Sequence, residues 1–592
     1  MTAGSRRRHY LGLAATLHDP ALAIVDEAGE VLFAESTERW VQRKRAFNMP
    51  ADLMGRTADL VRTHCGEQPD LVVAVSWSGG FLQRLRLLSL AELPGVRSVF
   101  GPVIARQLAR RDHLVWPLGH YRLLAQSMLS SLTQAGVNVQ WRSGADAVRR
   151  YDHHRSHAAL CLGSPFERAA CAVVDGFGEW TSTSCFTYDR GRLTALRRQG
   201  VRGSGRRASL GMFYAAVCSA CGFDPLQGEE WKVMGLAPYG NVDADVYRLL
   251  RPLLKVDGLE IVRGCSRAEY VQRLQRLRSL TRPPERPSID AADLARTGQQ
   301  VFADVMAELL TNLHRAAPRD NLVLAGGCAL NSSWNGRVVE ETPFRRLHVP
   351  AAPADDGTAL GAALLAWSEE HPGAPAGASV SDPYLGSVPS TDTLSGLARF
   401  GRLPGLRHLP GRIARTAAEL LSRGRIIGWM QGRAEFGPRA LGHRSILADP
   451  RVPGMTDLIN ERVKFREAFR PFAPAILHEH GDEYFEHYQE SRYMERALVF
   501  RPHVRERVPA VVHVDGTGRL QTVRREWAPE FHELVSHFHD LTGIPVVLNT
   551  SFNVMGRPIV HSVEDALGAF FTTGLDALVV DDWLLEKEPV GA

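Results

Sequence analysis

The chain of 592 residues is too long for one hydrophobic core, which predicts two to four domains. Its 70 basic and 65 acidic residues leave a net charge of +5, which argues against the broad basic surface that nucleic-acid binding needs. No stretch approaches the roughly twenty apolar residues of a membrane span. The eight cysteines are scattered, as in proteins of a reducing compartment. We therefore expect a soluble, cytoplasmic protein that binds neither nucleic acid nor a membrane.

Two stretches of the chain share one order of expected elements. Residues 10–37 predict a strand, a polar loop with His18, a second strand, a turn and a third strand. Residues 170–197 repeat this order, with Asp175 at the end of the first strand. The repeat predicts two similar lobes of the α/β class, as in the duplicated actin-like (ASKHA) ATPase fold. Coincidence is the alternative, because hairpins are common.

The segment between these stretches, residues 79–145, is rich in arginine and leucine at helical spacing. Its basic residues alternate with an ordinary apolar stripe, which favours a helical insertion packed on the first lobe. A helix for a membrane surface or a partner protein is the alternative.

Two histidines stand one helical turn apart. His153 and His157 would lie on one face of a helix, where both imidazoles can bind one cation. Asp175 closes the next strand, and the pair Asp355 and Asp356 stands at a later strand-to-helix turn, so these acids could add oxygen ligands. The structural alternatives are a capped helix end for the histidines and a helix N-cap for Asp356.

A glycine turn follows the strand predicted at 321–325. Gly326 and Gly327 open the turn that runs to Asn331, where the backbone could approach a phosphate or an adenosine. The residues before this strand, 292–316, predict a long amphipathic helix.

A stretch rich in proline and glycine begins at His371 and marks a linker, placed at 371–385. In the unit that follows, cationic side chains recur beside turns of glycine, proline, serine and asparagine. A single such run is usually a solvated face, whereas several together favour a site for phosphates and a small planar carbonyl group. The residues are Arg439, Lys464, Arg466, Arg470, Arg519, Ser551 and Asn553.

Five motifs together resemble those of the O-carbamoyltransferases of the NodU/CmcH/TobZ family, over essentially the whole chain. They are His153-His-Arg-Ser-His157, Glu230-Trp-Lys-Val-Met-Gly-Leu-Ala-Pro-Tyr-Gly240, Gly437-Pro-Arg-Ala-Leu-Gly442, Val463-Lys-Phe-Arg-Glu-Ala-Phe-Arg-Pro-Phe-Ala-Pro474 and Asn549-Thr-Ser-Phe-Asn553. One departure is Trp231, where a glycine is more usual.

The resemblance implies a fold and a reaction. It implies an N-terminal actin-like domain of the TsaD type, 1–370, and a C-terminal YrdC-like α/β domain, 386–592. The implied substrates are carbamoyl phosphate, ATP and a hydroxyl group of a natural product, with carbamoyl-AMP as the intermediate. The identity of the acceptor stays open, and a homodimer is compatible with the sequence.

The resemblance also implies a metal site in the N-terminal domain. The ion is expected to be Fe²⁺, although zinc or manganese suits the same ligands. The implied ligands are His153, His157, Asp175 and one acid of the 355–356 pair, for which we choose Asp355. In the same domain, the adenylate would lie against Gly326, Gly327 and Asn331.

The C-terminal domain is implied to bind ATP, with Mg²⁺, and the carbamoyl donor. Lys464 and Arg519 would act in forming carbamoyl-AMP. The pairs Lys464 with Arg466 and Ser551 with Asn553 are similar to the YrdC signature, and Arg439, Arg470 and Arg519 would contact phosphates.

Two residues of the first lobe complete the predicted transfer site. His18, on the loop after the first strand, is the candidate base for the acceptor hydroxyl, because an imidazole exchanges protons near neutral pH. Lys44 is a candidate cation for the acceptor or the adenylate. The structural alternative for His18 is a side chain that caps the hairpin.

Two other functions are compatible with the sequence. One is carbamoylation in a tRNA-modification or hydrogenase-maturation pathway, as in the TsaD and HypF relatives. The near-neutral charge speaks against tRNA, and the lack of paired CxxC zinc-finger segments speaks against the HypF type. The other is an ATP-binding sensor without catalysis.

Overall fold

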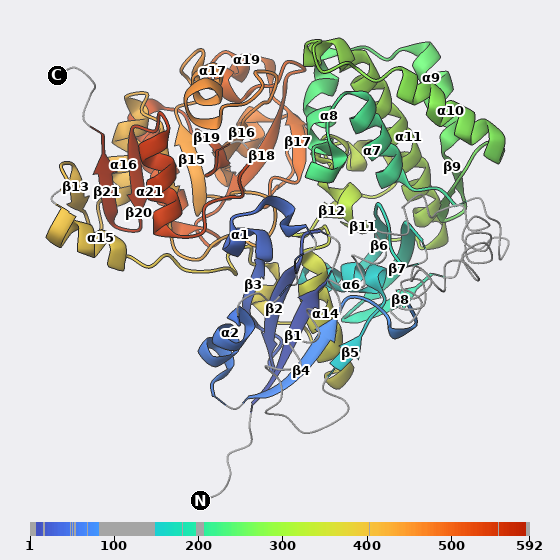
Figure 1. Cartoon of the computed structure of the whole chain (residues 1–592), viewed down its shortest axis with the longest axis horizontal. Helices are drawn as coiled ribbons and strands as arrows, with labels where there is room; N and C mark the ends of the chain where they lie inside the picture. The colour runs from blue at the N-terminus through green and yellow to red at the C-terminus, as the bar shows by residue number, and fades with distance from the viewer. Residues whose placement is uncertain are drawn as a thin grey trace, which may run out of the picture.

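The computed structural model describes residues 7–587, except 16–17, 48, 50, 52–54, 68, 82–147, 180, 197–206, 402 and 555. The predicted helical insertion at 79–145 therefore lies almost entirely outside the described residues. Three large sheets organise the described chain, and Figure 1 shows the C-terminal sheet beside two N-terminal lobes.

The first lobe is a five-stranded mixed sheet of order β3-β2-β1-β4-β5, in which β1, β2 and β3 are antiparallel and β4 and β5 run parallel to β1. Its strands are β1 (Arg8–Ala14), β2 (Ala21–Asp26), β3 (Val31–Ser36), β4 (Asp70–Val75) and β5 (Val148–Arg150). Helices α1 (Thr37–Val41) and α2 (Arg56–Cys65) lie between β3 and β4 in the chain. Helix α14 (Gly357–Glu370) packs across β1, β2 and β4. Gly12 permits this close approach, because a Cβ there would lie 1.8 Å from the carbonyl oxygen of Ala359.

The second lobe repeats the first strand for strand. Its order is β12-β11-β6-β7-β8, with β6, β7 and β8 antiparallel and β11 and β12 parallel to β6. The strands are β6 (Arg168–Val174), β7 (Thr183–Asp189), β8 (Arg192–Ala195), β11 (Asn321–Ala325) and β12 (Arg346–His348). The matching order confirms the predicted duplication, and the chain has the α/β actin-like fold.

Helices cover the second lobe and complete its core. They are α6 (His153–Ala159), α7 (Leu210–Ala220), α8 (Glu230–Leu236), α9 (Ala244–Leu250), α10 (Arg267–Ser279), α11 (Ala292–Ala316), α12 (Ser332–Asn335) and α13 (Val338–Glu341), with the small hairpin β9 (Lys255–Asp257) and β10 (Glu260–Val262). The bounds of α11 confirm the predicted long helix. It packs against α7, α8 and α9, and its apolar face is fully buried in their shared core.

The C-terminal part is built on a nine-stranded sheet of order β13-β21-β20-β14-β15-β19-β16-β18-β17. Its strands are β13 (Leu406–His408), β14 (Ile427–Met430), β15 (Arg444–Ala448), β16 (Ala473–Leu477), β17 (Arg496–Val499), β18 (Thr517–Val523), β19 (Val546–Ser551), β20 (Ala577–Val580) and β21 (Trp583–Glu586). Its helices are α15 (Asp392–Gly396), α16 (Ile413–Ser422), α17 (Met455–Ile459), α18 (Gly481–Tyr484), α19 (Pro502–Arg505), α20 (Pro529–Thr542) and α21 (Val563–Thr572). One hydrophobic core joins these elements, from Tyr384 to Leu585. That this part is YrdC-like, and the domain limits at 370 and 386, stay predictions.

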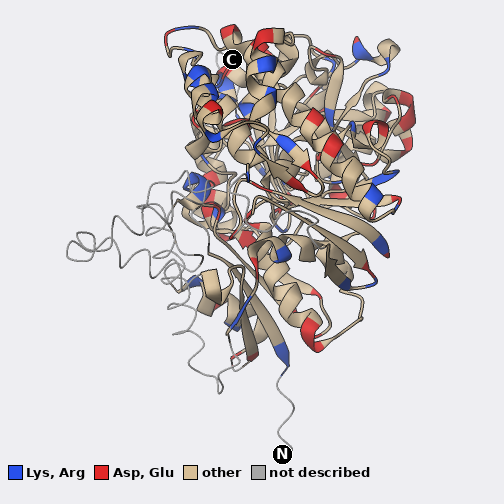
Figure 2. Cartoon of the chain, turned by 90° about the vertical axis from the view of Figure 1, so that its right-hand side faces the viewer, with Lys and Arg blue, Asp and Glu red and all other residues tan. Residues whose placement is uncertain are grey.

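The charges of the described chain are mixed. Figure 2 shows acidic and basic residues interspersed over the side of the molecule that it presents. Among the residues with described positions, no helix is both long enough and apolar enough to cross a membrane.

The buried carboxylate of Glu35, paired with Arg56 inside the first lobe, also contacts Ser387 and His561 of the C-terminal part. Glu35 of β3 is 3% exposed and accepts hydrogen bonds from the Arg56 guanidinium and from the backbone N–H of Ser387. Burial alone would raise the pKa of Glu35, but its bond to His561 and the charge of Arg56 outweigh burial and lower the pKa to about 2.

Replacing Glu35 with glutamine is expected to destabilise this junction by ~3 kcal/mol near neutral pH, because Arg56 then stays buried without its counter-charge. A carboxylate with a depressed pKa stabilises the fold above its unfolded pKa, about 4.5, and loses that effect as the pH falls toward 2. The difference between the wild type and Glu35→Gln should therefore shrink over this range. Denaturant unfolding from pH 7 to pH 2.5 measures it, and a constant difference would contradict the assignment.

Candidate active site

A cavity of about 1100 Å³ lies between the two lobes and the C-terminal sheet. It brings together most of the predicted site residues. Those in its wall are His18, Lys44, Asp175, Gly327, Asn331, Asp355, Arg439, Lys464, Arg466, Arg470, Arg519, Ser551 and Asn553. His153, His157 and Gly326 are not part of the wall. The two metal-type histidines are fully buried next to it.

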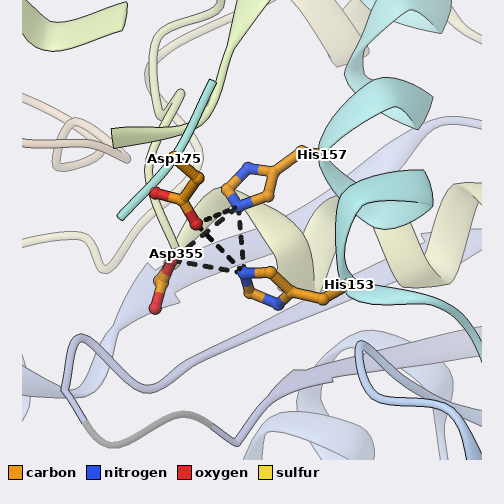
Figure 3. A group of neighbouring side chains, drawn as sticks. All are labelled: His153, His157, Asp175 and Asp355. Carbon is orange, nitrogen blue, oxygen red and sulfur yellow. Dashed lines mark hydrogen bonds and ion pairs between the residues drawn. The ribbon is translucent and has the colours of Figure 1, made fainter. Parts of the chain in front are cut away.

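The predicted metal ligands converge on one point, as Figure 3 shows. Helix α6 starts after its cap Asp152, and its geometry places His153 and His157, one turn apart, on the same face, with their Nε2 atoms 3.2 Å apart. His153 Nε2 lies 3.5 Å from both Asp175 Oδ2 and Asp355 Oδ1. The four ligand atoms all lie within 4.8 Å of one another.

These distances fit a single cation. Two ligand atoms held about 2.1 Å from one metal ion, at a right angle, lie about 3 Å apart, close to the separation of the two Nε2 atoms. Electrostatics agree with this reading. Burial alone would lower the pKa of His153, but its bonds to Asp175 and Asp355 raise it to about 10. A positive charge is therefore stabilised between the four side chains, and a divalent ion would supply it.

Asp355 and Asp356 point in different directions, and this decides which of them can be the fourth ligand of the histidine cluster. Asp356 turns away from the histidines, where it accepts hydrogen bonds from Ser36 Oγ at 3.1 Å and from the backbone N–H of Gly357 at 3.0 Å. It caps α14, as the structural alternative held, and Asp355 faces the histidines.

His18 stands beside this cluster. Its Nδ1 lies 2.8 Å from Asp19 Oδ2 and 3.9 Å from Asp355 Oδ2. The same Asp19 oxygen accepts a hydrogen bond from Arg45 Nη2 at 3.2 Å. This contact fixes the Asp19 carboxylate on the loop. Lys44 lines the cavity nearby, and burial lowers the pKa of its ammonium group. Asp19 is a site residue that the sequence analysis did not single out, although it directly follows His18.

The opposite wall is built by the turn after α17. Phe465 adopts a left-handed backbone conformation (φ 50°) between Lys464 and Arg466. The Lys464 ammonium donates hydrogen bonds to the turn at 551–553, including Asn553 Oδ1 at 2.8 Å and Ser551 Oγ at 3.2 Å. Burial, together with neighbouring arginines, lowers the pKa of Lys464 well below its usual value.

Four arginines crowd the same wall with few anionic partners. Burial lowers the pKa of Arg439 to about 10, of Arg466 to about 8 and of Arg470 to about 10, and that of Arg519 also falls. Three of their N–H groups, Arg466 Nη2, Arg470 Nε and Arg519 Nε, are buried without a hydrogen-bond partner in the described part of the chain. Buried donors and like charges of this kind are stabilised when an anion binds between them.

Of the residues predicted to bind the adenylate at the glycine turn, Gly327 and Asn331 line the cavity and Gly326 does not. Gly327 lines the cavity and donates its N–H to Asp175 Oδ1 at 3.0 Å. Gly326 instead shapes the turn, because it has φ 89° and a Cβ would lie 2.4 Å from Val174 O. Asn331 reaches the wall, but its side chain caps α12 and pairs with Gln299. Adenylate binding at this turn stays a prediction.

Two further wall residues were not given a role from sequence. The Trp77 ring stacks on His153, with centroids 4.3 Å apart, and follows strand β4 closely. His513 lies near Arg519, and burial together with that positive charge lowers its pKa to about 4, so its imidazole is neutral. His513 stands six residues before Arg519, which the sequence analysis did select, whereas nothing local pointed to Trp77.

Comparison with known proteins gives this architecture a family. The model described as Carbamoyltransferase N-terminus matches residues 120–364, and Carbamoyltransferase C-terminus matches residues 418–587. An uncharacterized protein of Synechocystis is 32% identical over 98% of this chain and 97% of its own length. Nodulation protein NolNO of Sinorhizobium fredii is 32% identical over 96% of this chain and 79% of that protein. The 3'-hydroxymethylcephem-O-carbamoyltransferase of Amycolatopsis lactamdurans is 32% identical over 74% of this chain and 80% of that enzyme.

The class that these observations define is a group-transfer enzyme on an actin-like fold with a cation-lined C-terminal sheet. The chain belongs to the carbamoyltransferase family, which confirms the resemblance noted from its motifs.

Proposed function

We propose that this protein is an ATP-dependent O-carbamoyltransferase that acts on a hydroxyl group of a natural product. Its substrates would be carbamoyl phosphate, ATP and the hydroxylated acceptor, and carbamoyl-AMP would be the intermediate. The observation that carries the proposal is the shared cavity. Asp175, Asp355 and His18 line it from the lobes, and Lys464 and Arg519 line it from the C-terminal sheet. An intermediate formed at one wall would have to cross only this cavity to reach the other, and a short path of this kind would limit hydrolysis of a reactive anhydride.

The first half-reaction would take place at the C-terminal wall. Water converts carbamoyl phosphate into carbamate and inorganic phosphate. A carbamate oxygen then attacks the α-phosphorus of ATP, a new P–O bond forms, and pyrophosphate leaves with the electron pair of the broken bond. The described arginines and Lys464 would hold the phosphates and neutralise their charge. Mg²⁺ that binds with ATP would add to this neutralisation.

The second half-reaction would take place at the lobes. The acceptor oxygen attacks the carbamoyl carbon, the bond from that carbon to the AMP oxygen breaks, and AMP leaves with the electron pair. With its Nδ1–H donated to Asp19, His18 carries its lone pair on Nε2, the atom that would take the hydroxyl proton. Lys44 would offset negative charge on the adenylate.

His153, His157, Asp175 and Asp355 would hold a divalent ion, for which we propose Fe²⁺. A bound ion of this kind polarises carbonyl or phosphate oxygens as a Lewis acid. The residues around it would keep the carbamoyl group in place and exclude water, since both histidines and Trp77 are buried.

The proposal predicts AMP release that depends on all three substrates. Purified protein would be incubated with ATP, carbamoyl phosphate and a panel of hydroxylated metabolites, and AMP and carbamoylated product would be measured by liquid chromatography. AMP and product are expected in equal amounts for at least one acceptor, with neither formed when carbamoyl phosphate is left out. AMP that stays at background with every acceptor, although carbamoyl phosphate is present, would count against the proposal.

A further inference from the structure

Trp231 of helix α8 belongs to the actin-like lobes but contacts the cationic wall of the C-terminal part. The Arg470 guanidinium carbon lies 3.8 Å from the centroid of the Trp231 ring, at stacking distance. Both side chains line the cavity. The contact therefore joins residues 239 positions apart, by the difference of their numbers, across the junction of the two parts.

Ion pairs of the adjacent Lys232 hold Trp231 and Arg470 in this contact. Lys232 Nζ lies 2.7 Å from Glu229 Oε1 on its own lobe and 2.7 Å from Glu467 Oε1 on the C-terminal turn. The second oxygen of Glu467 lies 3.4 Å from Arg470 Nη1. Glu467 thus ties Lys232 to Arg470, and the indole covers one face of the guanidinium.

This arrangement leaves in-plane donors of Arg470 for a ligand. Its side chain is 15% exposed, and its Nε is buried without a hydrogen-bond partner in the described chain. A guanidinium stacked on an aromatic ring keeps its N–H groups in the plane, where they can bind a phosphate in bidentate fashion. The neighbouring Arg466 and Arg519 in the same wall make an anionic ligand the matching one.

We propose that Trp231 is a positioning residue: it holds the guanidinium plane of Arg470 for a phosphate group of the donor substrates, so the actin-like lobe completes the anion site of the C-terminal part. The inference deepens the proposed function and rests on it for the identity of the donor. The anion site itself is tested separately with inorganic pyrophosphate.

Two substitutions separate stacking from simple packing. Trp231→Leu keeps an apolar side chain but removes the aromatic face, and it is expected to raise the dissociation constant for pyrophosphate about 3- to 30-fold, the range of a partly buried cation–π contact. Trp231→Phe keeps an aromatic face and is expected to stay within about threefold of the wild type. In ATP–pyrophosphate exchange, the same loss should appear in the KM for ATP with kcat nearly unchanged, since Trp231 would not touch the reacting atoms.

A double-mutant cycle tests the route through Arg470. In an Arg470→Gln background, Trp231→Leu should cause no further loss of pyrophosphate affinity, because the two changes remove the same interaction. Trp40→Leu is the matched control. It breaks another stacked pair, with Arg56 at 4.2 Å from the ring centroid, but Trp40 is not in the cavity wall. Its pyrophosphate affinity should equal that of the wild type.

Isothermal titration calorimetry with pyrophosphate, on variants shown to be folded by circular dichroism, decides the proposal. A Trp231→Leu protein that binds pyrophosphate as tightly as the wild type would overturn it. So would a wild type that does not bind pyrophosphate, or equal losses for Trp231→Leu and Trp231→Phe. If the wild type binds pyrophosphate and Trp231→Leu weakens it, but no exchange occurs, the positioning role stands and the proposed function fails.

Discussion

Lys464→Met is expected to lower carbamoyl-phosphate-dependent ATP–pyrophosphate exchange by about 10²- to 10³-fold, the loss typical of removing one charged group that stabilises a transition state. Lys464 is 2% exposed, and its ammonium is held by the turn at 551–553 in the same wall as the arginines. Methionine keeps an unbranched side chain that is one atom shorter and removes the ammonium group. Radiolabelled pyrophosphate incorporated into ATP measures the effect.

His18→Ala is the matched variant for this experiment, because it alters the other wall of the same cavity. It should leave exchange near the wild-type rate and lower carbamoyl transfer to the acceptor by about 10²- to 10⁴-fold, the usual contribution of a general base. Exchange that survives in a folded Lys464→Met protein, or that disappears in a folded His18→Ala protein, would refute this division of work between the two walls.

The second large effect concerns the metal. The double variant His153→Ala/His157→Ala is expected to lose the bound divalent ion, from about one ion per chain to background. It removes both nitrogen ligands and leaves Asp175 and Asp355 as two repelling carboxylates. Elemental analysis of protein purified without added metal measures the ion directly and also identifies it.

His154→Ala is the control for this loss, because it changes a neighbouring histidine of the same helix. The His154 ring is buried but lies 2.9 Å from Ser184 Oγ through Nδ1 and is not part of the converging group. The control should keep its metal. Full metal content in a folded double variant would refute the ligand set.

Local patterns were sufficient for much of the fold. Each lobe begins with three strands joined by short turns, so the alternation of apolar runs and polar loops predicted both copies within a few residues. The four-residue spacing of His153 and His157 predicted their shared face for the same reason, since helix geometry depends only on sequence separation.

Other parts of the site depend on three-dimensional contacts that no local pattern encodes. Asp355 and Asp356 are neighbours, and only the start of α14 decides which one faces the histidines. The stacking of Trp231 on Arg470 and the cavity itself require the lobes and the C-terminal sheet to dock. The low pKa of His513 likewise follows from burial that the fold creates.

The repeated strand order gives corresponding loops to the two lobes. The loop between β1 and β2 brings His18 and Asp19 to the cavity, and the loop that follows β6, in the matching position, brings Asp175. If both lobes descend from one ancestral half, these two loops began with identical side chains on the two sides of the cavity. One of these loops carries His18 and Asp19 and the other carries Asp175, so equivalent positions of a symmetric frame hold different side chains.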